Sequence, residues 1–248
     1  MPNKSSAPPA ASPLAAYQLA VERGGFHPDA AQSSAALQLE ECHSQLHLDS
    51  PQPAIAGVYL WGPVGRGKTW LLDSFHASLR VPSRRQHFHH FMRWVHQRLF
   101  QLTGTADPLL TLARELAHEV RVLCFDELFV NDIGDAMLLG RLFQAMFDQG
   151  VVIVATSNQA PHQLYSGGFN RQRFLPAISA IESHLRIVEV DGGQDHRLHP
   201  GQPQQRYWIT QSGKPSALET VFNQLAANLP IQLITEEVLL EKYAKGDE

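Results

Sequence analysis

The sequence has little cysteine, no long apolar run and no large excess of charge of either sign. Its two cysteines, Cys42 and Cys124, are far apart and form no framework for a disulfide-stapled secreted domain. The longest apolar run is VVIVA at 151–155, whereas a membrane-spanning helix needs about 20 apolar residues. The net charge is −4, whereas nucleic-acid-binding proteins are usually basic. We therefore expect a cytoplasmic protein with no integral membrane segment and no nucleic-acid partner.

The 248 residues are enough for one α/β domain with an appendage, and 44% hydrophobic residues are typical of a globular protein. Residues 1–13 are rich in Ser, Ala and Pro, which predicts disorder. Residues 14–50 have a helical pattern that ends before the DSPQP break. Residues 51–200 are expected to form the core domain, and 201–248 a short, incomplete helical tail or partial lid.

Short apolar runs alternate with helical patterns through the core. Asp107-Pro108 and Asp132 supply N-cap signals for two of the helices. This alternation predicts an α/β fold with a parallel sheet and flanking crossover helices. The expected strands are 57–61, 84–91, 120–126, 151–157 and 185–191, and the expected helices are 67–79, 91–103, 108–119, 133–148 and 172–184.

A glycine-rich stretch between a predicted strand and a predicted helix matches the Walker A pattern, G-x-x-x-x-G-K-[ST]. The glycines allow backbone N–H groups to turn inward around a phosphate chain, and the following helix directs its positive end to the same place. Lys68 can reach the β- and γ-phosphates, and the Thr69 hydroxyl can bind Mg²⁺. The predicted nucleotide-binding residues are Gly62, Pro63, Val64, Gly65, Arg66, Gly67, Lys68 and Thr69.

Two acidic residues, Asp126 and Glu127, follow the buried run VLCF. An acid at the carboxyl end of a buried strand lies beside the phosphate loop in doubly wound sheets. We expect Asp126 to hold Mg²⁺ and Glu127 to act as general base toward the attacking water. On their own, the two acids would be better explained as solvated side chains at a strand end, and the Walker A loop 57 residues earlier is what favours the functional interpretation.

Three further residues are candidates for the same reaction. Asn158 follows the next apolar strand, where its amide could hold the attacking water, although Asn-Gln-Ala-Pro is also good turn chemistry. Arg171 and Arg173 follow a Gly-Gly turn and could reach the nucleotide of a neighbouring subunit. By charge placement alone, these arginines are better explained as ordinary surface residues at a helix start than as catalytic residues.

Long blocks of residues 14–200 resemble the ZapE-type ATPases, bacterial cell-division proteins with mitochondrial relatives in the AAA+ superfamily. The matching blocks are GVYLWGPVGRGKTWLLDSF, FHHFM, VLCFDELFVNDIGDAMLLGRLFQAMFDQGVVIVATSN, LYSGGFNRQRFLPAI and VDGGQDHRL. The resemblance implies a P-loop ATPase that uses ATP and Mg²⁺, and it places Arg171 and Arg173 in the segment of the arginine-finger candidates. Family members continue much further beyond the last block, so an incomplete lid is expected.

The resemblance also implies a function: ATP hydrolysis coupled to remodelling of a protein partner, the tubulin-like division-ring protein. It implies a nucleotide-dependent homo-oligomer, attached peripherally to the inner membrane through its partner. The motifs alone leave three alternatives: a loader or switch that acts on a helicase or nucleic acid, a nucleotide-binding remnant with weak turnover, and a small-molecule kinase. The kinase ranks last, because it does not predict Asp126-Glu127 followed by ATSN on the next strand.

Overall fold

The computed structural model describes residues 12–23, 28–48 and 54–192. The predictions for residues 1–11 and 201–248 lie outside these ranges. The strands are β1 (Gly57–Trp61), β2 (Ser83–His87), β3 (Val122–Asp126), β4 (Val152–Ser157) and β5 (Leu185–Glu189). The helices are α1 (Pro13–Glu22), α2 (Ala30–Leu46), α3 (Lys68–Ser78), α4 (Phe88–Gln101), α5 (Pro108–Glu119), α6 (Ile133–Asp148) and α7 (Leu175–His184), with 3-10 turns η1 (Pro161–Gln163) and η2 (Arg171–Arg173).

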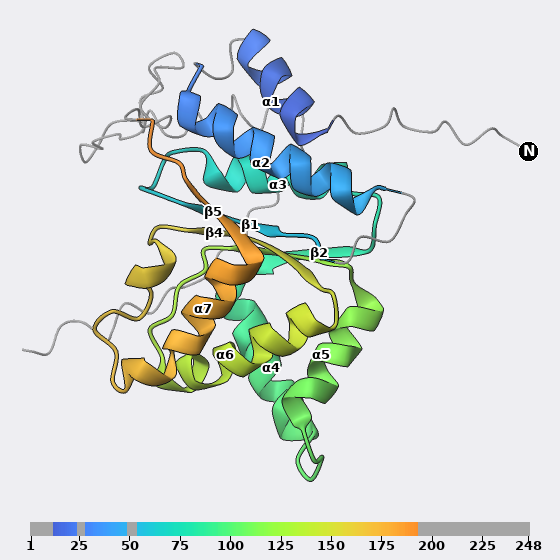
Figure 1. Ribbon diagram of the computed structural model, residues 1–248, viewed down its shortest axis with the longest axis vertical. Helices are drawn as coiled ribbons and strands as arrows, with labels where there is room; N and C mark the ends of the chain where they lie inside the picture. Colours follow the sequence, from blue (N-terminus) through green and yellow to red (C-terminus); the bar gives the residue numbers. More distant parts are fainter. Residues whose placement is uncertain (1–11, 24–27, 49–53, 193–248) are drawn as a thin grey trace, which may run out of the picture. The chain divides into compact units, whose positions relative to one another are not determined.

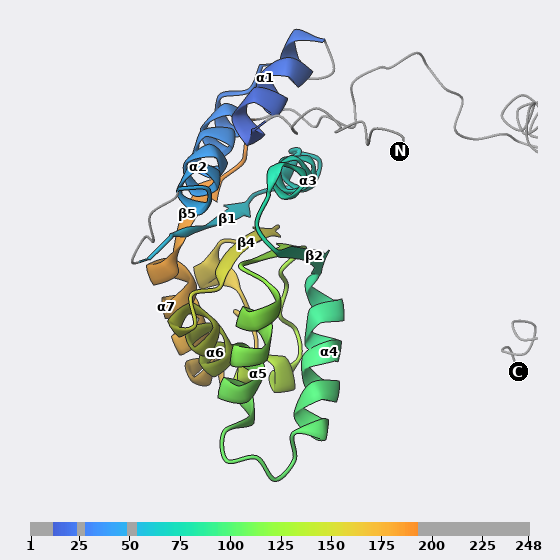
Figure 2. The same ribbon diagram turned by 90° about the vertical axis from the view of Figure 1, so that its right-hand side faces the viewer.

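The five strands form one parallel sheet in the order β2-β3-β4-β1-β5, with helices on both faces (Figures 1 and 2). Helices α1, α2 and α3 cover one face, and α4 to α7 cover the other. Successive side chains on a strand point to opposite faces of the sheet. Leu123 and Phe125 therefore pack toward α4–α7, and Val122 and Cys124 pack toward α2 and α3. The predicted parallel sheet with flanking helices is confirmed.

The sheet brings the carboxyl ends of its strands to one edge of the molecule. Strand β4 pairs with both β1 and β3, and Trp61 lies opposite Ser157. The loop after β1, Asp126 at the end of β3 and Asn158 after β4 therefore lie beside one another. Gly57 permits the close approach of β1 to β4, because a Cβ at that position would lie 1.9 Å from the carbonyl oxygen of Ile153.

Two helices, α5 and α6, have the bounds predicted from the sequence, and N-cap side chains account for where they begin. The Asp107 carboxylate accepts a hydrogen bond from the Leu110 N–H, and α5 spans the predicted 108–119. The Asp132 carboxylate accepts from the N–H groups of Gly134 and Asp135, and α6 spans the predicted 133–148. These side chains satisfy backbone donors that the first turn of a helix leaves without partners.

Two predicted boundaries are wrong by three residues or more, and β3, β4 and β5 are one or two residues shorter than expected. The strand expected at 84–91 ends at His87, and α4 begins at Phe88. Phe88, Phe91, Met92 and Val95 are buried at helical spacing, so their packing on the sheet decides in favour of a helix.

The helix expected at 172–184 also starts later. Residues 171–173 form the separate turn η2, and α7 begins at Leu175 with Pro176 in its first turn. Proline suits the first turn of a helix, because its missing N–H has no intrahelical partner there. Within the described ranges, no helix has both the length and the apolar character needed to cross a membrane.

Candidate nucleotide site

The loop between β1 and α3 has the backbone of an anion-binding turn. Gly62, Gly65 and Gly67 have φ values of 147°, 85° and 81°, which favour glycine. Gly67 is the N-cap of α3 and supplies no side-chain acceptor, so the first N–H groups of the helix face the loop without a side-chain cap. Residues 64–70 line a cavity of about 300 Å³ together with Glu127, Thr156, Ser157 and Asn158.

Lys68 is the buried cation of this cavity, with only 7% of its surface exposed. Its Nζ donates hydrogen bonds to the carbonyl oxygens of Gly62, at 2.6 Å, and Pro63, at 2.7 Å. Burial lowers the pKa of the Lys68 ammonium to about 8, an effect that the Asp126 carboxylate partly opposes. A buried ammonium beside a helix N-terminus that has no side-chain cap favours a polyanionic ligand such as a nucleoside triphosphate.

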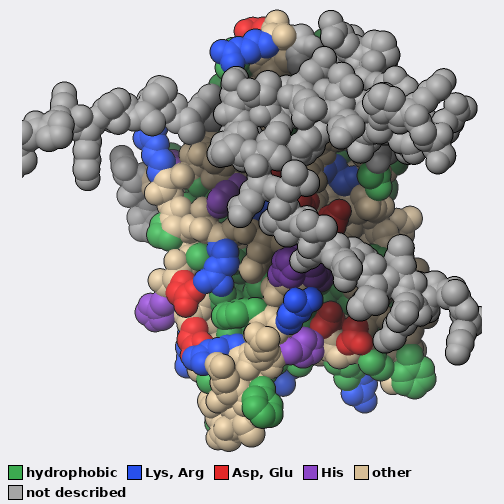
Figure 3. All heavy atoms as spheres, turned by 180° about the vertical axis from the view of Figure 1, so that it is seen from behind, with side chains coloured by type: hydrophobic (Ala, Val, Ile, Leu, Met, Phe, Trp, Pro, Cys, Tyr) green, Lys and Arg blue, Asp and Glu red, His purple; other side chains and the backbone are tan. Residues whose placement is uncertain are grey.

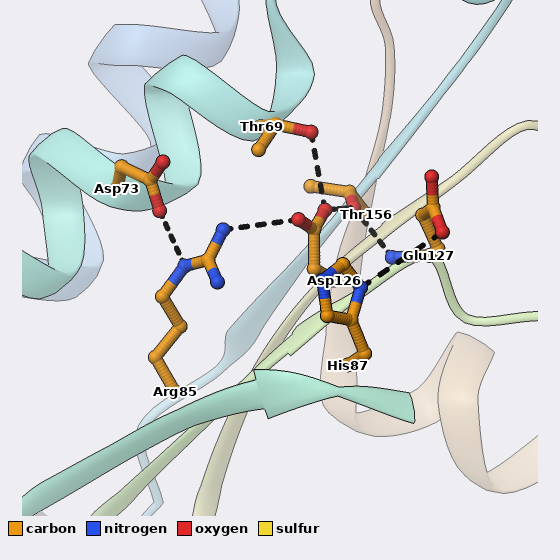
Figure 4. Close-up of polar contacts among 7 residues, drawn as sticks. All are labelled: Thr69, Asp73, Arg85, His87, Asp126, Glu127 and Thr156. Atoms are coloured by element: carbon orange, nitrogen blue, oxygen red, sulfur yellow. Dashed lines mark hydrogen bonds and ion pairs between the residues drawn. The ribbon is translucent and has the colours of Figure 1, made fainter. Parts of the chain in front are cut away.

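Asp126 is joined directly to the phosphate loop (Figure 4). Its side chain is buried, and Oδ1 accepts hydrogen bonds from Thr69 Oγ1 at 3.1 Å and Thr156 Oγ1 at 2.7 Å. Oδ2 accepts from Nη2 of Arg85 at 3.0 Å. A hydroxyl and a carboxylate are the hard oxygen ligands that Mg²⁺ prefers, so Thr69 and Asp126 fit the expected metal.

Glu127 is oriented by its own backbone. Its φ of 54° is unusual for a residue with a side chain, and its N–H donates to Thr156 Oγ1 at 3.0 Å. The carboxylate lines the cavity, is 70% exposed, and has Oε2 3.8 Å from Nδ1 of His87. Thr156 therefore contacts both acidic residues. Its hydroxyl donates to the Asp126 carboxylate and accepts from the backbone N–H of Glu127.

The other predicted residues divide into two groups. Asn158 is exposed and lines the cavity with Glu127, as a water-positioning amide would. Arg171 and Arg173 lie on η2 and are not among the residues that line it. Arg171 Nη2 instead donates to the carbonyl oxygen of His162 at 2.6 Å.

Sequence reasoning missed Thr156, Arg85 and Gln32. Thr156 carries a weak signal, since it is a polar residue directly after the apolar run VVIVA. Arg85 lies on β2 and contacts Asp126 on the neighbouring strand β3, and no local sequence motif predicts this contact. Gln32 on α2 is 2% exposed, and its Nε2 donates to the carbonyl oxygen of Arg66 in the phosphate loop at 2.9 Å.

Replacing Gln32 with leucine is expected to destabilise the fold by about 1 kcal/mol and to weaken ATP binding several-fold. The variant loses the hydrogen bond that fixes the Arg66 peptide, which directly precedes the left-handed Gly67. Thermal unfolding and ATP titration measure the two effects. Gln45→Leu is a matched control on the same helix, because the Gln45 amide donates to the exposed Glu41 carboxylate at 3.5 Å, away from the phosphate loop. Equal effects of both substitutions would contradict the role of Gln32.

Comparisons with known proteins agree with this geometry. A model of the family described as AFG1-like ATPase matches residues 11–245. The chain is 43% identical over 212 residues to "Cell division protein ZapE" of Escherichia coli K12, covering 75% of this chain and 56% of that protein. It is 37% identical over 201 residues to "Lactation elevated protein 1 homolog B" of Danio rerio, covering 75% of this chain and 40% of that protein.

The chain therefore spans about half the length of these two relatives. Among solved structures, the crystal structure of DnaI matches with a TM-score of 0.52 and 20% identity, covering 69% of this chain and 87% of that one. A likeness at that identity shows the fold alone, and it confirms the expected P-loop NTPase architecture. The family match over residues 11–245 and the 43% identity confirm the resemblance found in the sequence blocks: the chain belongs to the AFG1-like ATPase family.

Proposed function

We propose that this chain binds ATP with Mg²⁺ and hydrolyses it, and that turnover remodels a protein partner in bacterial cell division. The hydrogen bond between Thr69 and Asp126 carries the ATPase proposal, because it joins the phosphate loop, whose Thr69 and buried Lys68 line the cavity, to the acid at the end of β3. The partner is suggested by the name of the E. coli relative, "Cell division protein ZapE". By resemblance, that partner is the tubulin-like division-ring protein.

In this mechanism, Lys68 and the N–H groups of the loop bind the β- and γ-phosphates. Thr69 and Asp126 would hold Mg²⁺, whose charge would neutralise charge on the phosphate oxygens. Glu127 accepts a proton from the water whose oxygen forms a bond to the γ-phosphorus, while the bond from that phosphorus to the bridging oxygen of ADP breaks. Asn158 orients the water. The products are ADP and inorganic phosphate.

The proposal does not include nucleic acid as a partner. Figure 3 shows the face opposite to that in Figure 1. In the part drawn in colour, Lys and Arg, acidic and histidine side chains are interspersed. A general nucleic-acid-binding surface is instead a basic patch or stripe. The likeness to DnaI concerns the fold alone and supports no partner for this chain.

Phosphate release by the purified chain tests the proposed activity. We expect release that depends on ATP and Mg²⁺ and stops when EDTA removes the metal. A chain that binds ATP with Mg²⁺ but releases no phosphate would instead be a nucleotide-binding remnant. Sedimentation with and without the division-ring protein, in the presence of ATP, tests the partner separately, and no shift in that experiment would contradict the proposed remodelling partner.

Alanine at Arg171 or Arg173 is expected to slow phosphate release by about 1,000-fold if that residue acts in trans on a neighbouring subunit. ATP affinity is expected to stay unchanged, because neither arginine lines the cavity of its own chain. The wild-type rate per chain should rise with protein concentration as the oligomer forms. Phosphate release measured over a range of concentrations provides both results.

Mixing provides the control for this prediction. A Glu127→Gln chain keeps its arginines, and an arginine variant keeps its Glu127. Mixed oligomers of the two inactive chains should therefore hydrolyse ATP at the arginine variant's sites. Mixtures that stay inactive, or arginine variants that keep the wild-type rate, would rule out the trans role.

A further inference from the structure

A guanidinium is held between two carboxylates at the side of the nucleotide site (Figure 4). Arg85, on the edge strand β2, donates from Nη2 to Asp126 Oδ2 at 3.0 Å, and its Nε pairs with Oδ1 of Asp73 on α3. The Arg85 side chain is 25% exposed, Asp126 is 4% exposed, and Asp73 is 50% exposed. The arginine thus connects the buried acid to an anchor at the surface.

Together with the two threonines, Arg85 fixes the orientation of the Asp126 carboxylate. Oδ1 accepts from Thr69 and Thr156, which come from α3 and β4, while Oδ2 accepts from Arg85 on β2. Rotation of the carboxylate would break at least one of these hydrogen bonds. Only Oδ1 is therefore directed toward Thr69, the residue expected to bind Mg²⁺.

The strand register explains why Arg85 and not its neighbour has this position. Strand β2 runs parallel to β3 with Arg85 opposite Cys124, whose side chain packs on the α3 side of the sheet. Arg84 points to the other side, where it pairs with Glu119 and lies over the Trp94 ring, 5.7 Å from its centroid. The chain thus offers an adjacent arginine on the same strand without access to Asp126.

We propose that Arg85 is a positioning residue for the metal-binding carboxylate, and that Asp73 fixes Arg85 in that position. This inference rests on the proposed function, in which Asp126 serves a magnesium nucleotide. With Oδ2 occupied, Asp126 cannot bind a metal through both oxygens. Mg²⁺ needs near-ideal octahedral geometry, whereas Ca²⁺ accepts bidentate carboxylates in a looser shell. Arg85 therefore favours Mg²⁺ over Ca²⁺ at this site.

Lysine is not an equivalent residue at position 85. An arginine fork contacts two carboxylates at once in a fixed plane, whereas an ammonium is a point charge on a flexible stem. A lysine would keep the positive charge but lose the fixed connection between Asp73 and Asp126. Comparison of Arg85→Lys with Arg85→Gln therefore separates positioning from charge.

Binding of a fluorescent ATP analogue to the full chain in Mg²⁺, Ca²⁺ or EDTA tests the inference. In the wild type, we expect tighter binding with Mg²⁺ than with EDTA or Ca²⁺. Arg85→Gln and Arg85→Lys should both reduce this Mg²⁺ enhancement by about tenfold or more, the usual effect of losing an outer-shell partner. Their affinities in EDTA should stay unchanged, and their preference for Mg²⁺ over Ca²⁺ should fall. A purely structural defect would weaken binding in all three conditions.

Two matched variants complete the experiment. Arg84→Gln should keep the full Mg²⁺ enhancement, because Arg84 faces away from Asp126. Asp73→Asn removes only the half-exposed anchor, and it should reduce the enhancement in the same direction as the Arg85 variants. Since Asp73 is exposed, this variant keeps the test available even where an Arg85 variant fails to fold.

The outcomes separate this inference from the proposed function. A wild-type chain that binds the analogue equally in Mg²⁺ and EDTA would overturn the proposed function and this inference together. A wild-type Mg²⁺ enhancement that the Arg85 and Asp73 variants retain would overturn the inference alone. So would an Arg85→Lys variant with wild-type behaviour, since charge without positioning would then suffice.

Discussion

Replacing Glu127 with glutamine is expected to slow ATP hydrolysis by about 100-fold or more while ATP binding stays unchanged. The amide cannot accept the proton that the attacking water releases, but it has nearly the same size as the carboxylate. The backbone contact with Thr156, which orients residue 127, remains in the variant. Because the Glu127 side chain is 70% exposed, the substitution should change the free energy of unfolding by less than about 0.5 kcal/mol. Single-turnover phosphate release and ATP titration measure the two functional properties.

Glu119→Gln is the matched control for this prediction. Glu119 is an exposed glutamate at the end of α5 that pairs with Arg84 and does not line the cavity. Its replacement should leave the rate of phosphate release unchanged. A Glu127→Gln chain that releases phosphate at the wild-type rate would remove Glu127 from its role as general base, whatever the effect on binding.

Methionine at position 68 is expected to weaken ATP binding by about 3 kcal/mol, or about 100-fold. The substitution keeps an unbranched side chain in the buried position of Lys68 but removes the charge that would pair with the phosphates. The carbonyl oxygens of Gly62 and Pro63 also lose their donor, so the loop should become less ordered. Isothermal titration with ATP and Mg²⁺ measures the loss. Unchanged affinity would show that the nucleotide does not bind at this loop.

The pH dependence of ATP binding provides an independent control on Lys68. The pKa of the ammonium is lowered to about 8 by burial, so the free protein loses this proton above pH 8. In the proposed binding mode ATP pairs with the protonated form, so each pH unit above 8 should weaken binding by up to about tenfold. The affinity of the wild type should therefore be constant below pH 7 and fall by about tenfold between pH 7 and pH 9. In Lys68→Met this decline should disappear, and a decline equal to that of the wild type would assign the titration to another group.

Much of the candidate site could be predicted, because local sequence specifies it. The glycines and Lys68 of the phosphate loop act within a few residues of one another. Asp126 is the last residue of a buried strand, which places it at the carboxyl edge of the sheet whichever strands are its neighbours. Asp107 and Asp132 mark helix starts through hydrogen bonds to the next turn. Each of these signals needs only the chain immediately around it.

The residues that sequence reasoning missed depend on the pairing of distant strands. Arg85 meets Asp126 because β2 is the parallel neighbour of β3, and Thr156 meets it because β4 lies on the other side. No pattern within a single segment records which strands are neighbours or how they align. The wrong boundary at His87 has a related cause, since packing of the first turn of α4 on the sheet decides where the strand ends. The trans role of Arg171 and Arg173 stays a prediction, because it concerns a second copy of the chain.

The absence of a side chain at Gly57 is also important for this site. Any side chain at its Cβ position would meet the backbone of the adjacent strand β4 at Ile153. The two strands would then move apart, and the tips that carry the phosphate loop and Asn158 would separate with them. A residue without any functional group, located at the opposite end of β1, thus helps to hold together the strands that carry the candidate nucleotide site.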